Sequence, residues 1–218
     1  VMGLVVDPST PNTIYAASEW SGIWKSTDGS RTWQWASNGL KTGITATSTF
    51  RSLAIDPVNP QRLLYASAAD DTRVDDGLGG LWASNDRANS WRHIAFTGCD
   101  KPEIKDVAFS GARAYVSTTN CGLLTNNDLN FTTWTKMTLP AGVASFDSVA
   151  PARTAASKDV VFACTGKAVW RFSGTGVTGT WTKGATTLGG NCFALARVPD
   201  DSAVTSVLVQ YASTQAQK

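Results

Sequence analysis

Short apolar runs alternate with polar turn clusters along the whole chain, and this alternation recurs about every 50 residues. The clearest marker is Tyr-Ala-Ala-Ser at 15–18, whose equivalents begin at Tyr65, Tyr115, Phe162 and Tyr211, at intervals of 50, 50, 47 and 49 residues. Self-similarity at such a period is typical of arrays that copy one supersecondary unit. The 218 residues therefore read as one continuous array rather than two unrelated domains.

The first repeat contains signals for four short strands. An Asp7-Pro8 pair stops the first apolar run, and a tight Asp28-Gly29 turn connects the third run with the fourth. We expect these strands at residues 3–6, 13–17, 22–26 and 32–35. Four strands in about 45 residues is the spacing of a propeller blade.

The later repeats restate this pattern with changes. Repeat two carries an acidic insertion at 69–79, and repeat five supplies two strands before the sequence stops at Lys218. We expect an all-β fold, a β-propeller of four-stranded antiparallel blades, with about four and a half blades in this chain. The expected blades are residues 2–40, 50–97, 103–140 and 145–184, with a half blade at 190–213. The expected strands in these later repeats are 50–55, 62–66, 80–84, 90–94, 122–125, 133–136, 160–163, 168–172, 180–183, 193–198 and 204–212.

An array of four and a half blades would expose a strand edge and one uncovered blade face at each end. The first repeat begins with a first strand, so it has no spare strands to complete the last blade. We therefore expect roughly two or three further blades from a continuation or a partner chain.

Composition narrows the classes of partner. Nineteen Lys plus Arg against 17 Asp plus Glu give a net charge of +2. The sequence has no stripe of basic residues that could follow a phosphate backbone, which argues against nucleic acid as a partner. No apolar run reaches the ~20 residues that a membrane span needs. The first residues lack the basic flank of a signal peptide, so for a secreted protein we expect the signal to be already removed.

The four cysteines have no C-x-x-C spacing, and a single histidine argues against a zinc site. Three disulfide pairings are possible. Cys99 precedes the first strand of repeat three and Cys121 follows its second strand, and antiparallel neighbours bring those ends together. Cys164 and Cys192 stand in an analogous relation. We favour these two pairs, and hence an oxidising, extracellular compartment, over four buried thiols in a cytosolic protein.

One turn motif points to a family. Residues 26–33, Ser-Thr-Asp-Gly-Ser-Arg-Thr-Trp, resemble the Asp-box, Ser-x-Asp-x-Gly-x-Thr-Trp, and residues 84–91 form a second copy. A third copy, at 127–134, has one extra residue. The chain is thus similar to Asp-box (BNR) propellers, which include sialidases, xyloglucan-degrading hydrolases, Vps10-type sorting receptors and photosystem assembly factors. Ser30 and Ala88 replace the glycine of the motif.

The resemblance implies a structural role for the box residues, on the face opposite the ligand site. These residues are Ser26, Asp28, Trp33, Ser84, Asp86 and Trp91. An Asp in such a turn accepts hydrogen bonds from nearby backbone amides, and the Trp packs between strands. The third-strand tryptophans Trp24, Trp82 and Trp170 are also expected in the core.

The candidate ligand face carries the loops between second and third strands together with the linkers between blades. In the first such loop, Glu19 and Trp20 pair a carboxylate with an aromatic ring that does not fit the core register. Residues 15–22 look like the first-blade segment of xyloglucan-degrading propellers, in which an aspartate at this position is catalytic. The resemblance implies that Glu19 is catalytic and Trp20 binds sugar; otherwise both belong to a solvated loop.

The acidic insertion is the second candidate region. We expect its charged residues to contact substrate and one of its carboxylates to complete a catalytic pair, since glycoside hydrolysis needs two carboxylates about 5–10 Å apart. These residues are Asp70, Asp71, Arg73, Asp75 and Asp76. The carboxylates could also bind calcium, although the spacing does not match an EF-hand; otherwise the loop is simply solvated, and no other metal or cofactor is expected.

The function that the sequence favours is a secreted β-propeller that recognises polysaccharide or another glycan. If it is an enzyme, it is a glycoside hydrolase of the xyloglucanase type that uses paired carboxylates. The alternative is a non-catalytic extracellular scaffold, of the Vps10 or assembly-factor type, that binds protein segments on the same face.

Overall fold

The computed structural model of the chain describes residues 3–18, 21–40, 48–69, 80–99, 102–153, 159–197 and 207–211. These residues form strands, turns and loops and no helix, which confirms the predicted all-β class. The strands make four four-stranded antiparallel sheets and one two-stranded sheet. In each four-stranded sheet the strands pair in chain order, as in a propeller blade.

The strands of the first two blades are β1 (Gly3–Val6), β2 (Ile14–Ser18), β3 (Gly22–Ser26) and β4 (Gln34–Trp35), then β5 (Ser48–Ile55), β6 (Leu63–Ala69), β7 (Gly80–Ser84) and β8 (Arg92–Ile94). Those of the next two are β9 (Ile104–Ser110), β10 (Arg113–Thr118), β11 (Gly122–Asn126) and β12 (Thr135–Lys136), then β13 (Ser148–Arg153), β14 (Asp159–Thr165), β15 (Ala168–Thr175) and β16 (Thr178–Lys183). The two-stranded sheet pairs β17 (Cys192–Arg197) with β18 (Val207–Tyr211).

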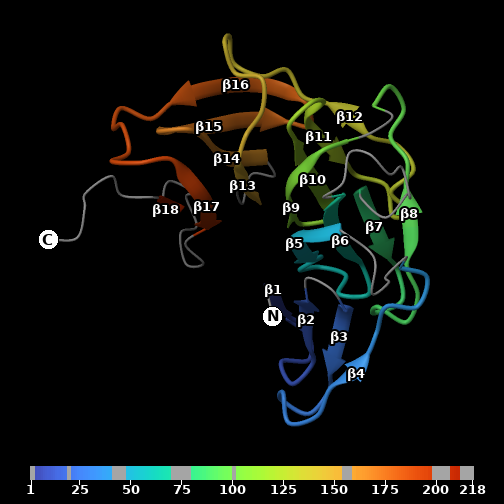
Figure 1. The fold of residues 1–218 in the computed structure, drawn as a ribbon. Helices are drawn as coiled ribbons and strands as arrows, with labels where there is room; N and C mark the ends of the chain where they lie inside the picture. The colour runs from blue at the N-terminus through green and yellow to red at the C-terminus, as the bar shows by residue number, and fades with distance from the viewer. Residues whose placement is uncertain are drawn as a thin grey trace, which may run out of the picture.

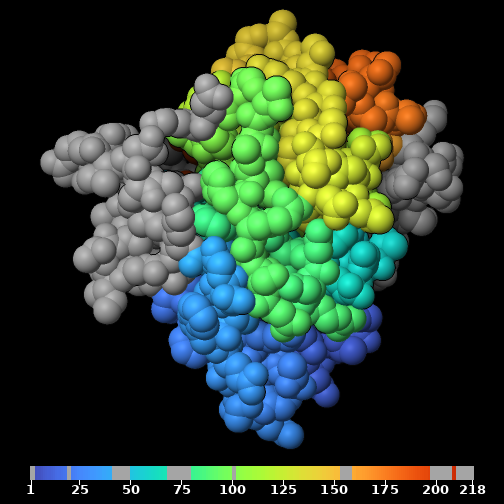
Figure 2. All heavy atoms as spheres, turned by 90° about the vertical axis from the view of Figure 1, so that its right-hand side faces the viewer, coloured from blue at the N-terminus to red at the C-terminus, as the bar shows by residue number. Residues whose placement is uncertain are grey.

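The blades follow one another along an arc (Figure 1). The first strands β1, β5, β9, β13 and β17 lie on the inner side of the arc, and each of the first four contacts the first strand of the next blade. The fourth strands lie on the outer side. Seen from the side, successive blades pack against one another from the first blade, in blue, to the fourth, in orange (Figure 2).

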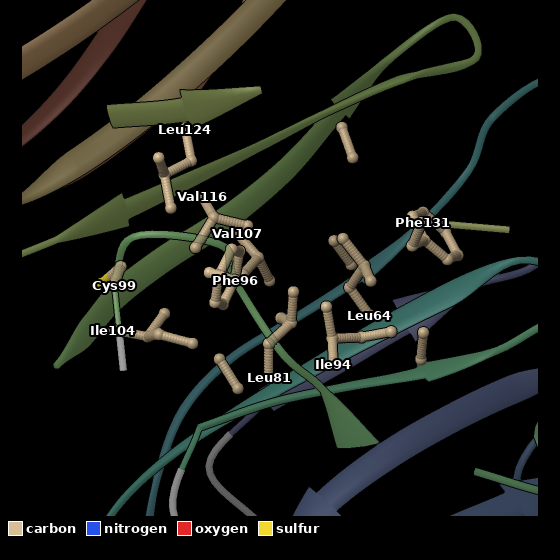
Figure 3. Packing of buried hydrophobic residues seen from close by; sticks show 14 residues of the cluster. Leu64, Leu81, Ile94, Phe96, Cys99, Ile104, Val107, Val116, Leu124 and Phe131 are labelled. Atoms are coloured by element: carbon tan, nitrogen blue, oxygen red, sulfur yellow. The ribbon is translucent and has the colours of Figure 1, made fainter. Parts of the chain in front are cut away.

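The hydrophobic core lies between blades, because neighbouring sheets bury their facing sides against each other. The cluster between the second and third blades is shown in Figure 3. There Leu64 and Leu81 of the second blade meet Val107 and Val116 of the third, and Phe131 closes one end. Similar clusters occupy the other junctions. Side chains that alternate along each strand therefore serve two different interfaces.

The fourth strands of the first three blades begin later than the pattern predicts. In the first blade the expected strand starts at residue 32, whereas β4 starts at Gln34. The reason is that the Thr32 amide donates to Asp28 Oδ1 at 2.9 Å and so belongs to the turn. The turn residues thus compete with the strand for backbone donors.

The third-strand tryptophans are less uniformly buried than predicted. Trp82 is 4% exposed and lies in the core between the first two blades. Trp24 and Trp170 are only partly buried. Trp24 pairs across the strands with Trp35, which is 54% exposed, so this part of the first blade faces solvent.

Candidate ligand-binding face

Each blade has two ends, which gives the array two faces. We call the face with the turns between second and third strands and the linkers between blades the linker face. We call the opposite face, with the turns between third and fourth strands, the hairpin face. The described parts of the linker face are the turns 119–121 and 166–167 and the linker segments 36–40, 95–99, 102–103, 137–147 and 184–191.

Both predicted disulfides are present, and both lie on the linker face. Cys99–Cys121 ties the linker before the third blade to the turn between β10 and β11, with a Cα–Cα distance of 6.1 Å. Cys164–Cys192 ties the end of β14 to the start of β17, with a Cα–Cα distance of 6.2 Å. The described residues contain no free cysteine. Covalent links therefore fix the loops of this face to the blades.

Backbone hydrogen bonds bring the same turns and linkers together. The Thr119 amide donates to the Glu103 carbonyl at 2.8 Å, and the Glu103 amide donates to Asn120 Oδ1 at 3.0 Å. In the next blade the Cys192 amide donates to the Gly166 carbonyl at 2.7 Å. The described turns of the linker face are thus held rigidly, as a binding surface requires.

A polar pair marks the junction between the third and fourth blades on this face. Lys105, which is the extra residue of a bulge in β9, lies 2.7 Å from Asp147 Oδ1 just before β13. The Gly166 amide donates to the other Asp147 oxygen at 3.1 Å. The two side chains remain 29% and 32% exposed. Bulges often re-aim side chains next to functional sites, and this one directs a lysine to the rim.

Asp106 joins the inner strands of neighbouring blades. Its Oδ1 accepts a hydrogen bond from Ser52 Oγ of β5 at 2.8 Å, and its Oδ2 accepts one from Ser148 Oγ of β13 at 2.7 Å. Ser148 Oγ in turn accepts from the Leu195 amide of β17 at 3.1 Å. This chain of hydrogen bonds crosses four successive first strands, so it sets the spacing of the blades around the inner side.

Burial raises the pKa of the Asp106 carboxyl above its ordinary value. Donors from the Val149 amide and Ser148, followed by Ser52 and the Val107 amide, act in the opposite direction. All four donors contact the carboxylate at 2.7–2.9 Å. With its oxygens engaged in this way, Asp106 is suited to hold blades together rather than to attack a substrate.

A groove of about 600 Å³ lies on the outer part of the linker face. It runs between the β10–β11 turn and the linker that follows β12, and the exposed stem of Lys136 borders it. Its lining residues are Thr119, Asn120, Lys136, Met137, Thr138, Leu139, Val143 and Ala144. The mixed polar and apolar lining is compatible with either a sugar or a peptide segment.

On the hairpin face, the polar side chains of the turns form hydrogen bonds within the protein. In the first blade, Ser26 Oγ donates to Asp28 Oδ1 at 2.8 Å and accepts from the Ser30 amide at 2.9 Å. Thr32 donates to Asp28 through both its hydroxyl and its amide, and with Ser26 it lowers the pKa of Asp28 to about 2. In the third blade burial raises the pKa of Asp128, but amide donors led by Thr132 outweigh it and lower that pKa to about 2.

The second copy of the turn has the same contacts. Ser84 Oγ donates to Asp86 Oδ1 at 2.8 Å, and Ser90 donates to Asp86 through its amide and hydroxyl. Trp91 is 5% exposed, and its Nε1 donates to the Ala36 carbonyl of the first blade at 2.8 Å. Trp33 is only partly buried. The structural role of the box residues remains our prediction, and these contacts are what it requires.

Arginines bridge the blade junctions on the hairpin face. The bridges are Arg87 to the Asp7 carboxylate at 2.9 Å, Arg62 to the Asp128 carbonyl at 3.1 Å, and Arg113 to the Asp159 carboxylate at 3.4 Å. Arg62 is 2% exposed and also pairs with Asp56 at 2.7 Å. Because these arginine and aspartate side chains are already paired within the protein, the linker face is the better candidate for ligand binding.

The predicted substrate-contacting residues lie outside the described residues. They are Glu19, Trp20, Asp70, Asp71, Arg73, Asp75 and Asp76. The described part of the chain contains no group of three or more His, Cys, Asp or Glu side chains that could hold a metal. It also contains no helix long and apolar enough to span a bilayer.

Sequence reasoning missed the polar groups of the inner strands. Asp106 lies within the apolar run of β9. Asp147 directly precedes β13, whose first residue is Ser148. A charged residue inside a predicted buried strand signals a partnered, special position. That signal was available, but the identity of the partners in other blades was not.

The described strands define an open array of β-propeller blades. No protein-family model matches the chain, and no curated protein matches its sequence. Solved structures that resemble it share the fold at low sequence identity. An ancestral GH74 enzyme superposes with a TM-score of 0.66 at 17% identity, over 96% of this chain and 29% of that one.

Two further structures extend the comparison. The GH74 xyloglucanase from Xanthomonas campestris superposes with a TM-score of 0.62 at 15% identity, over 94% of this chain and 34% of its own. YCF48 bound to D1 peptide superposes with a TM-score of 0.55 at 12% identity, over 87% of this chain and 55% of its own. The chain thus spans about a third of the GH74 structures and just over half of that YCF48 chain.

Proposed function

We propose that this chain is part of an extracellular β-propeller that recognises polysaccharide on its linker face. The observation that carries the proposal is the position of both disulfides, which fix the loops of this face and no described turn of the opposite one. Structural disulfides form and persist in oxidising compartments, which supports an extracellular location. Rigid loops favour binding, because less conformational entropy is lost when the ligand is held.

Xyloglucan is the first polysaccharide to test, since one of the similar structures is named a xyloglucanase. In this proposal Trp20 stacks on a sugar ring and the charged residues of the 70–76 loop contact its hydroxyls. Glu19 acts as one of two catalytic carboxylates if the protein hydrolyses the chain. Its partner comes from the 70–76 loop or from a further blade, because the described Asp106 is engaged with four donors.

The alternative is a protein-binding scaffold on the same face. It is favoured by the similarity to a YCF48 structure with a bound peptide and by the groove beside the β10–β11 turn. An extended peptide could lie in this groove, whose walls combine apolar Leu139 and Val143 with polar Asn120.

The test is titration calorimetry of the purified protein with xyloglucan oligosaccharides, paired with an assay for released reducing ends. Trp20→Ala should weaken binding by roughly tenfold, which corresponds to the loss of about 1.4 kcal/mol of stacking. The matched control is Trp35→Ala, which removes a 54% exposed tryptophan from an outer strand and should leave binding unchanged.

Glu19→Gln separates catalysis from binding. It should abolish any hydrolysis while oligosaccharide affinity stays within about twofold, because the amide keeps the shape of the side chain. Hydrolysis that survives this substitution contradicts the catalytic assignment. Absence of oligosaccharide binding by the unsubstituted protein, with binding of a peptide that Lys136→Glu abolishes, favours the scaffold.

A further inference from the structure

The outer strand of the fourth blade differs from the other outer strands. β16 has six residues, whereas β4, β8 and β12 have two, three and two. Repeat four lacks the Ser-x-Asp turn, and its two-residue turn at Gly176 and Val177 keeps β15 and β16 paired from Thr175–Thr178 onward. The loss of the polar turn therefore creates a long hairpin.

This hairpin ends in an unpaired edge. β16 is the last strand of its sheet, and none of the described strands pairs with its outer side. Five of its six residues are exposed, and Lys183 carries its one charge. Proteins normally protect an edge by making it short, charged or interrupted by proline. β16 has one lysine at its end and three threonines, which favour extended structure.

The direction of its backbone groups follows from the ladder. The Gly184 amide donates to the Val169 carbonyl of β15 at 2.8 Å. In an antiparallel ladder, residues alternate between bonding inward and pointing outward. Gly179, Trp181 and Lys183 therefore direct their N–H and C=O groups away from β15, ready to pair with another strand.

We propose that β16 pairs antiparallel with β16 of a second copy of this chain, about a two-fold axis at Trp181. In this register the outward groups of the two strands meet, which gives about six hydrogen bonds. Thr180 lies opposite Thr182 of the second copy, a favourable cross-strand pair. Lys183 lies opposite Gly179 of the second copy, so no like charges meet and the lysine has space.

The packing of the blade leaves the axis open. Trp181 is on the axis, but its ring packs inward against Phe146 and Phe172, with centroid distances of 4.9 and 5.3 Å. Its Nε1 donates to the Thr138 carbonyl of the third blade. The ring therefore does not cover the backbone at the centre of the edge. The register is self-complementary, because threonine meets threonine and the one lysine meets glycine, and this favours a second copy over an unrelated strand.

The first experiment is sedimentation velocity over a concentration series. The purified chain should shift from the protomer mass toward twice that mass as concentration rises into the range of about 10–500 μM, as expected for a small interface. A protein that remains at the protomer mass over this range overturns the proposal. Binding of an extended peptide of another sequence to β16 would not rescue it.

Two matched double variants test the register. In Thr180→Glu with Thr182→Glu, carboxylates face each other across the axis, and the dimer should be lost. In Thr180→Lys with Thr182→Glu, opposite charges face each other, and the dimer should form at least as well as in the original chain. Both change the same two exposed positions. Equal dimerisation of the two variants overturns the proposed register.

Amide hydrogen exchange supplies a readout that does not depend on substitution. The outward amides of Gly179, Trp181 and Lys183 should exchange rapidly in dilute protein and slow at least tenfold in concentrated protein. The amides of Thr180 and Thr182 bond to β15 and should be protected at both concentrations. Association without slower exchange at the outward amides places the contact elsewhere and overturns the proposal.

Discussion

At the scale of single residues, the hairpin turns hold non-glycine residues in the left-handed backbone region. Ser30 has φ 72°, Ala88 has φ 62° and Phe131 has φ 54°. The Asp-box pattern has a glycine at the position of the first two. An L-residue in this region costs roughly 1–2 kcal/mol. The hydrogen bonds from these turns to Ser26 and Ser84 therefore stabilise a strained backbone.

Glycine should relieve this strain at one position and not at the other. Ser30 is exposed, so Ser30→Gly should raise the free energy of unfolding by about 0.5–1 kcal/mol. Ala88 is 1% exposed and belongs to the core between blades, so Ala88→Gly also loses about 0.8 kcal/mol of buried methyl. Its net change should be near zero.

Urea unfolding of the two variants measures the difference. Equal stabilisation by both substitutions would contradict the contribution that we assign to the Ala88 methyl group. Destabilisation by Ser30→Gly would contradict the strain itself.

Asp28 gives the protein an acid-sensitive contribution to stability. The Thr32, Ser26 and Arg31 donors lower its pKa from 3.8 to about 2 in the folded state. Because the folded pKa is lower than the unfolded one, this contribution is complete above pH about 4 and is lost as the pH falls from 4 to 2.

Asp28→Asn should therefore reduce the pH dependence of unfolding within that window. Chemical unfolding of both proteins at several pH values gives the measurement. The stability difference between them should shrink as the pH falls toward 2, and a difference that stays constant between pH 5 and 2 would contradict the assignment.

Residue types predicted the turn chemistry better than the inner polar network. The Ser and Asp of each box lie close in sequence, so their mutual contacts follow from spacing alone. Asp106, by contrast, contacts Ser52 and Ser148 at sequence separations of 54 and 42 residues. Such contacts depend on how blades are placed beside each other, and a single sequence does not specify that placement.

At the scale of elements, buried arginine contacts hold blades together on the hairpin face. Arg62 directly precedes β6, pairs with Asp56 and donates a hydrogen bond to the Asp128 carbonyl of the third blade. Its guanidinium lies 4.4 Å from the centre of the Phe131 ring. One side chain therefore connects a turn, a neighbouring hairpin and the core.

Arg62→Ala should cost about 3–5 kcal/mol of unfolding free energy, because Asp56, at 0% exposure, would lose its counter-ion. Arg87→Ala is the matched control. Asp7 is as buried as Asp56, and both aspartates keep amide donors from their own turns, but Arg87 is 36% exposed, so water can take its place. This control should cost at most about 1 kcal/mol. Similar costs for the two variants in urea unfolding would contradict the role assigned to burial.

The predicted strand boundaries are correct where apolar alternation determines them. They are wrong where a side chain accepts hydrogen bonds from the backbone amides that would otherwise join the strand. The starts of β1, β3, β7 and β11 agree with the sequence pattern. The fourth strands of the first three blades are shorter than predicted because their first residues bond to Asp28 and its equivalents. In the fourth blade, where that aspartate is missing, the strand is longer than predicted and begins at Thr178.

At the scale of the whole molecule, the repeat period was sufficient to predict a propeller array. Each repeat buries its two faces only against neighbours, so a regular period implies stacked blades. The two disulfides also followed, because antiparallel strands place their cysteines at one face. The site could be predicted only as far as this face, since its chemistry depends on loops whose conformation the repeat does not specify.

The array exposes apolar residues at both of its ends, and the further blades that would cover them remain a prediction. Leu4 and Val6 of β1 are 60% and 50% exposed, and Phe193 and Leu208 of the β17–β18 sheet are both 63% exposed. These strands lie at the two ends of the arc (Figure 1). In a closed propeller the corresponding faces are covered by adjacent blades.

The central claim is that the linker face binds the ligand, and an exchange footprint with xyloglucan oligosaccharides tests it most directly. At saturation, amides of the turns 119–121 and 166–167 and their adjoining linkers should exchange more slowly, while the hairpin turns 26–33 and 84–91 stay unchanged. Slower exchange confined to the hairpin turns, or no change at saturating oligosaccharide, would contradict the account.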